Sequence, residues 1–145
     1  MIPRPGLSFV VTIFMTMSAQ VLAEAGSSAA SEDEAILTGA VHRQVESMNR
    51  EDLSAYMDGI HPKAPIFDRY KIVMGQLFTV YDLNTRTEKI KVLSVDRDYA
   101  IVRLTLSKRK IQGRAHFRDT TVESLWVYRR EKSLWLLWST LSLSA

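Results

Sequence analysis

The spacing of apolar residues changes once along this chain of 145 residues, at about Leu83. Before that point apolar positions recur every three or four residues, as on one face of an amphipathic helix. After it they alternate with polar positions, and β-branched and aromatic residues become frequent, as in half-buried strands. A run of helices followed by a run of strands predicts an α+β fold, with the helices packed on one face of a curved antiparallel sheet.

Three helices are predicted before the change of period. The first begins at Ser31, whose hydroxyl forms a capping box with Glu34. A shorter second helix takes Asn49 as its cap and Asp52 as the partner of that cap. The third spans about residues 65–82, and its apolar face is so wide and aromatic that we expect it to be enclosed on more than one side.

Four long strands are predicted after the helices. Tight turns are expected at residues 96–98 and 131–133, and the third strand is expected to begin near Ala115. The inward-facing residues of the second strand are Ala100, Val102, Leu104 and Leu106. In the last strand one face is predicted to hold Trp135, Leu137, Leu141 and Leu143, and the other Leu136 and Trp138. Since the helices cover only one face of the sheet, we expect the second apolar face to form a homodimer.

The first 23 residues have the pattern of a secretory signal peptide. Arg4 precedes an apolar stretch at residues 7–17, and small residues suit cleavage after Ala23 or Ala25. The apolar stretch is shorter than the roughly 20 residues that cross a bilayer, so no membrane span is expected after cleavage. We therefore predict a secreted or periplasmic protein.

The composition excludes several kinds of chemistry. The chain has no cysteine, which excludes disulfides, thiolate nucleophiles and iron–sulfur clusters, and its three histidines are not spaced to share one face. We expect no metal site and no cofactor. Nucleic acid is not an expected partner either, because basic runs such as Lys108-Arg109-Lys110 lie at predicted strand ends. The balance of apolar and charged residues predicts one globular domain at residues 31–145, after a mobile leader at residues 24–30.

The order of these elements resembles a known superfamily. The stretch MNREDLSAYMDGIHP at residues 48–62, the third helix leading through LFTVYDL, and KIQGRAHFRD before a Trp-bearing hairpin are similar to bacterial nuclear transport factor 2-like proteins. That group includes SnoaL-like proteins and ketosteroid isomerase. The resemblance implies a cone-shaped barrel, in which a curved sheet of about four strands wraps on three N-terminal helices and leaves a pocket at its open end. Because the group contains enzymes and binding modules, the fold leaves the function open.

Five residues are candidates for binding a ligand in that pocket, namely His61, Asp68, Tyr70, Tyr56 and Arg118. No catalytic residue is assigned. The base and paired acid of an isomerase are not visible, and neither a Gly-x-Ser-x-Gly elbow nor a phosphate-binding loop occurs. The favoured interpretation is an exported module that binds a small apolar or weakly acidic ligand. Structural roles are the alternative for these residues, such as core packing for Tyr56.

Two alternatives stay open. One is an isomerase or dehydratase in which His61 acts as the acid/base group, assisted by Asp68 or Tyr70. The other is an adaptor that binds a different protein through the apolar face of the sheet. The first alternative places the function at the second helix, and the second places it on the strands.

Overall fold

The computed structural model describes residues 17–144, with side chains from residue 29 onward. The chain divides into two units, Met1–Glu32 and Asp33–Ala145. Most of the predicted signal peptide, residues 1–16, lies outside the described residues, so the signal peptide stays a prediction. In the part that is described, no helix combines the length and the apolar character that a membrane span requires.

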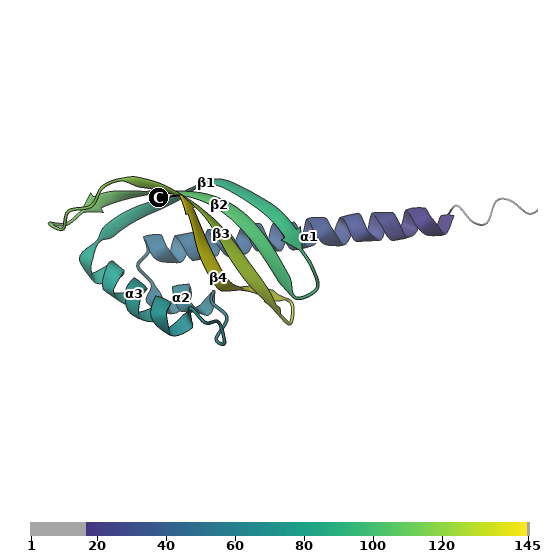
Figure 1. Cartoon of the computed structure of the whole chain (residues 1–145), viewed down its shortest axis with the longest axis horizontal. Coiled ribbons are helices and arrows are strands. Elements are labelled where there is room, and N and C mark those ends of the chain that lie inside the picture. Colours follow the sequence, from purple (N-terminus) through teal and green to yellow (C-terminus); the bar gives the residue numbers. More distant parts are fainter. Residues whose placement is uncertain (1–16, 145) are drawn as a thin grey trace, which may run out of the picture. The chain divides into compact units, whose positions relative to one another are not determined.

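Three helices precede four strands, as the change of period predicts. The helices are α1 (Met17–Asn49), α2 (Leu53–Asp58) and α3 (Phe67–Val80), and the strands are β1 (Asp82–Val95), β2 (Tyr99–Gln112), β3 (Thr120–Glu131) and β4 (Leu134–Ser144). The strands form an antiparallel meander in the order β1-β2-β3-β4. Figure 1 shows them side by side in one bent sheet, with α2 and α3 on its hollow side. The predicted α+β fold is confirmed.

The helix boundaries differ from the prediction in two places. The predicted start at Ser31 is wrong, because α1 passes through this residue without interruption. The preceding segment is rich in alanine, which favours the helix strongly enough to extend it. The predicted cap at Asn49 is also wrong: Asp52 caps α2 by accepting a hydrogen bond from the backbone N–H of Ala55 at 3.0 Å. The Asn49 amide instead donates to the backbone carbonyl of Thr85 at 2.8 Å and accepts from its N–H at 2.7 Å.

α1 ends in a turn that is usually made by glycine. The backbone N–H of Asp52 donates to the carbonyl of Ser47 at 3.0 Å, and that of Glu51 donates to the carbonyl of Met48 at 3.1 Å. These are the two hydrogen bonds of a Schellman motif. The residue at its left-handed position is Glu51, with φ of 54°. A side chain in this conformation costs roughly 1 kcal/mol relative to glycine, so Glu51 is held in a strained backbone position.

The turns of the meander agree with the prediction, but the start of the third strand does not. In the turn at residues 96–98, the Asp96 carboxylate accepts from the backbone N–H groups of Asp98 and Tyr99 at 2.9 and 2.8 Å. β3 begins at Thr120 rather than near Ala115. Residues 113–119 therefore form a loop, because their alternation is too weak to pair with a neighbouring strand.

β-Bulges bend the sheet and change the face that β4 presents. Register shifts occur at three places between β1 and β2 and at two between β3 and β4, and each extra residue kinks its strand. The shift just before Tyr128 turns the second half of β4 over. Trp135 and Leu137 are therefore 3% and 1% exposed, whereas Leu141 and Leu143 are 59% and 43% exposed. The prediction that these four residues share one face is wrong.

α3 packs on the core through one side only. Met74 is buried, but Ile72 and Val80 are 62% and 51% exposed. Aromatic residues at its ends, including Tyr70 and Phe78, are half-buried against the core. The expected enclosure of this helix is wrong, because the sheet reaches only its inner side.

The core lies between the hollow side of the sheet and the helices. β2 contributes its predicted inward-facing residues, and all four are buried: Ala100, Val102, Leu104 and Leu106. From α1, Leu37, Val41 and Val45 meet them at the helical spacing of four. Trp126 and Tyr128 complete the core from β3.

Candidate functional site

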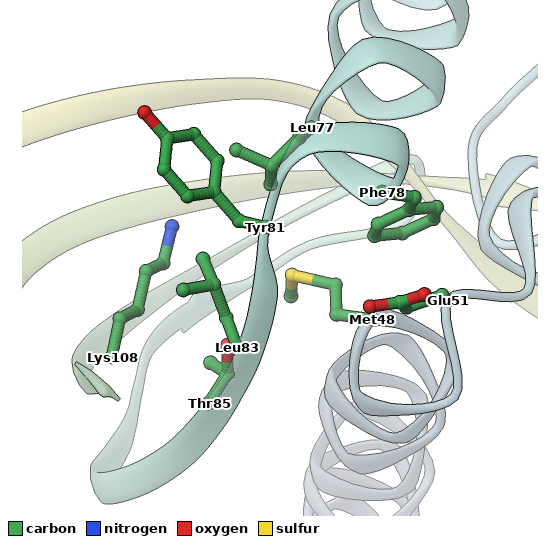
Figure 2. Close-up of a pocket in the computed structure, with 8 residues that line it drawn as sticks. All are labelled: Met48, Glu51, Leu77, Phe78, Tyr81, Leu83, Thr85 and Lys108. Carbon is green, nitrogen blue, oxygen red and sulfur yellow. The ribbon is translucent and has the colours of Figure 1, made fainter. Parts of the chain in front are cut away.

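One end of the core is incomplete, and a small pocket lies there between the end of α1, the last turns of α3 and strands β1 and β2. Figure 2 shows its lining residues: Met48, Glu51, Leu77, Phe78, Tyr81, Leu83, Thr85 and Lys108. We call it the Lys108 pocket. Its free volume is about 10 Å³, which is room for about one water molecule. Its lining is mainly apolar and aromatic with a few polar groups, as is typical of ligand sites.

Lys108 supplies the positive charge of the pocket. It pairs with Thr85 of β1 and Thr120 of β3, and it follows the buried positions of β2 at the same alternation. Burial lowers the pKa of its ammonium group, because the charged form loses water contact. Within residues 29–144 the Lys108 side chain takes part in none of the ion pairs. In Figure 2 the Lys108 side chain extends toward Tyr81.

The acidic group of the pocket comes from the strained turn at the end of α1. Glu51 is exposed and lies next to Met48, on the other side of the pocket from Lys108 in Figure 2. The two hydrogen bonds between Asn49 and Thr85 join this turn to β1. The wall formed by α1 and the wall formed by the sheet are therefore held together directly beside the pocket.

Leu77 and Tyr81 separate the Lys108 pocket from an open groove along α3. The residues that line this groove are Val73, Gln76, Leu77, Val80 and Tyr81, which form one stripe at helical spacing. The free volume of the groove is about 310 Å³. The ring of Tyr81 meets that of Phe117 edge to face, with centroids 5.5 Å apart. Leu77 and Tyr81 therefore lie between the small Lys108 pocket and the more open surface of α3.

His61 lies outside this pocket, at the edge of β4, and is 2% exposed. Its Nδ1 accepts a hydrogen bond from the backbone N–H of Lys63 at 3.1 Å, so the proton is on Nε2, which donates to Glu131 at 3.0 Å. Its backbone N–H donates to the carbonyl of Leu137 at 2.9 Å. The ring packs edge to face on Trp138, with centroids 5.2 Å apart. These contacts occupy both ring nitrogens and support a structural role.

The other four predicted ligand-binding residues are dispersed. Tyr56 is buried in the core, where loss of solvent raises the pKa of its hydroxyl well above its usual value. The hydroxyl of Tyr70 is hydrogen-bonded to that of Thr140. Asp68 is exposed in the first turn of α3, and Arg118 is exposed in the loop before β3. None of the five predicted residues lines the Lys108 pocket, and ligand binding by any of them stays a prediction.

No metal-binding group is formed by the described side chains. Among residues 29–144, no three His, Asp or Glu residues gather closely enough to hold an ion. The polar groups of the Lys108 pocket are a lysine, a glutamate, a threonine and a tyrosine. This set can bind an anion or donate hydrogen bonds more readily than it can coordinate a cation.

Solved structures show the same fold as this chain. A nuclear transport factor 2-like family protein from Streptomyces avermitilis, to which dehydratase activity has been ascribed, is 19% identical, with a TM-score of 0.65 over 79% of this chain and 99% of its own. A nuclear transport factor 2-like protein of unknown function from Shewanella oneidensis is 17% identical, with a TM-score of 0.59 over 76% and 98%. A protein of unknown function with a cystatin-like fold from Nostoc punctiforme is 11% identical, with a TM-score of 0.62 over 76% and 89%.

These likenesses confirm the predicted nuclear transport factor 2-like fold. No curated protein matches the sequence. One family does, described as the C-terminal domain of the anti-sigma-I factor RsgI9, and the match spans residues 40–144. That range contains every residue of the Lys108 pocket. The chain therefore belongs to the family of the anti-sigma-I factor RsgI9 C-terminal domain.

Proposed function

We propose that this protein is an exported module that binds a small, mainly apolar ligand in the Lys108 pocket and catalyses no reaction. The observation that carries the proposal is the combination of a mainly apolar lining with a partly buried lysine that takes part in no ion pair among residues 29–144. A lysine without an acidic partner beside a cavity is suited to an anionic partner from outside the chain.

The family supports a binding role. Its description, the C-terminal domain of an anti-sigma-I factor, names a regulatory factor and no enzymatic activity. The alternative of an isomerase or dehydratase is supported by the activity ascribed to the Streptomyces avermitilis protein. That alternative needs His61 to exchange protons with a substrate, and the ring nitrogens of His61 are already engaged by Lys63 and Glu131.

Native mass spectrometry of the protein purified from its own host tests the proposal. We expect a mass above that of the polypeptide, which is lost on denaturation. The matched variant is Met48→Trp, which fills the pocket from a half-buried position and should abolish the added mass while the protein still unfolds cooperatively. A wild-type protein that carries no ligand and binds none of a panel of small apolar molecules would contradict the proposal. So would a ligand that Met48→Trp retains.

We further propose that the outer face of the sheet associates with a second copy of the chain. Large apolar residues are exposed on β1, β2 and β4: Leu93, Tyr99, Leu134, Leu141 and Leu143. Exposed apolar residues on one face of a sheet are typical of association surfaces. Light scattering at micromolar concentration should give the mass of a dimer, and Leu141→Lys should give that of a monomer. A monomeric wild type that retains a different protein in stoichiometric amount would instead favour the adaptor alternative.

A further inference from the structure

The geometry points to one class of ligand for the Lys108 pocket: an unbranched amphipathic monocarboxylate, whose carboxylate pairs with Lys108 and whose tail passes between Leu77 and Tyr81 into the groove along α3. This inference rests on the proposed function, since it names the ligand of the same pocket.

The head group is indicated by the inward-facing positions of β2. Four consecutive inward positions are apolar and buried, from Ala100 to Leu106, and the next two are Lys108 and Lys110. The Nζ of Lys110 donates to the backbone carbonyl of Ala115 at 2.5 Å. Of the two, only Lys108 lines the pocket. A carboxylate there would provide a charge-assisted hydrogen bond, which is about twice as strong as a neutral one.

A ligand with one negative charge fits this pocket better than a ligand with two negative charges or with a positive charge. The lining contains one lysine and one glutamate, and Glu51 is exposed to water, so its charge is screened. A ligand ammonium group would have to displace Lys108 from its position or remain at the rim beside Glu51. A second carboxylate would face either Glu51 or the apolar side chains of Met48 and Leu83. The polar groups therefore favour a monoanion.

The tail is indicated by the wall between the two cavities. The Lys108 pocket has room for about one water, and the open groove beyond Leu77 and Tyr81 has a free volume of about 310 Å³. Because the same two side chains line both cavities, a change in their rotamers would join the two spaces. The groove is lined by Val73 and Val80, which are 46% and 51% exposed. The tail assigned to the ligand is therefore a narrow apolar chain.

Calorimetric titration with octanoate, 1-octanol and octylamine tests the head group, because the three probes share one tail. We expect octanoate to bind at least about tenfold more tightly than 1-octanol, since a hydrogen bond between charged groups contributes about 1.5–3 kcal/mol. Octylamine should bind more weakly than 1-octanol. Lys108→Gln should remove the preference for octanoate, whereas Lys110→Gln, two residues along the same strand, should change it less than about twofold. Glu51→Gln should strengthen octanoate binding by up to about twofold, because it removes a screened like charge.

A chain-length series from butyrate to octanoate tests the tail. Each methylene that enters the groove should increase affinity about fourfold, and Val80→Asp should flatten the series while leaving butyrate unchanged. If the three eight-carbon probes bind equally and Lys108→Gln changes nothing, the ligand class is wrong although the pocket binds ligands. If octanoate binds no more tightly than butyrate, the route between Leu77 and Tyr81 is wrong. If no probe binds and no ligand accompanies the purified protein, the proposed function itself fails.

Discussion

The two ends of the central strands differ in whether their charged side chains have partners. At the turn end, formed by the β1–β2 and β3–β4 turns, Arg130 donates to Asp33 at 2.9 Å and to the carbonyl of Arg97 at 3.0 Å, and its guanidinium lies 4.2 Å from the centre of the Trp135 ring. At the pocket end, Lys108 takes part in no ion pair among residues 29–144, and Glu51 has a φ of 54°. Each end has one non-glycine residue with a positive φ, since Lys132 in the β3–β4 turn has a φ of 56°. The two ends therefore differ in charge pairing: the turn end pairs its charged groups, and the pocket end keeps a lysine that a ligand could use.

The largest effect is expected for His61, whose ring belongs to the turn end through Glu131. His61→Ala should lower the free energy of unfolding by about 2–3 kcal/mol, because it leaves a buried cavity and an unpaired Lys63 amide. Urea denaturation measures the change. His116→Ala, at an exposed position, is the matched control and should change stability by less than about 0.5 kcal/mol. Loss of turnover without loss of stability would instead support the enzyme alternative.

Substitution of Asp33 should cause the next largest loss of stability. Its carboxylate accepts from Arg130 at 2.9 Å and from the indole N–H of Trp135 at 3.1 Å. Asp33→Ala leaves both donors unpaired and should cost about 2 kcal/mol. The exposed Asp58 provides the control, since Asp58→Ala should be nearly neutral. Equal effects of the two substitutions in urea denaturation would mean that the turn end is not specially stabilised.

Substitution of Lys108 should raise the free energy of unfolding rather than lower it. Lys108→Met removes a partly buried charge and should stabilise the protein by up to about 1 kcal/mol at neutral pH. The lowered pKa of Lys108 means that the unfolded chain binds more protons between that pKa and the value of 10.5 for a free lysine. The wild type should therefore gain stability as pH rises through this window. Between pH 7 and 10.5, the free energy of unfolding should rise less in Lys108→Met than in the wild type, as measured by denaturation. The same dependence on pH in both proteins would contradict the burial of this ammonium group.

The smallest predicted effect concerns Glu51. Glu51→Gly should stabilise the protein by up to about 1 kcal/mol, because glycine favours the left-handed position of a Schellman motif. Glu51→Ala removes the charge but keeps the Cβ atom, so it should not reproduce the gain. Thermal unfolding of the two variants separates backbone strain from charge. Destabilisation by the glycine variant would show that the turn is not strained.

The fold could be predicted from local pattern, whereas several details depend on tertiary contacts. Alternation in β2 and the residues of the tight turns identify the meander directly. The bulge before Tyr128, which exposes Leu141, has no local signal because it depends on the pairing of β3 with β4. Similarly, Ser31 has the sequence of a cap, but the alanine-rich segment before it continues the helix.

The candidate site was less predictable, although its main residue had a signal. The register of Ala100 to Leu106 places Lys108 on the inward side of β2, yet in a linear sequence it reads as one of three bases at a strand end. His61 attracts a functional interpretation because of its residue type, and only the structure shows its two partners. The Lys108 pocket combines residues of α1, α3, β1 and β2, and no local pattern determines how these elements meet.

Small ligands are expected to bind at the pocket end and not on the outer face of the sheet. The most direct test is an NMR titration of the isotopically labelled protein with octanoate. Saturable chemical-shift changes are expected for Met48, Leu77, Tyr81 and Lys108, with little change at Tyr99 and Leu141. Shifts confined to Tyr99 and Leu141, or none up to millimolar octanoate, would contradict this expectation.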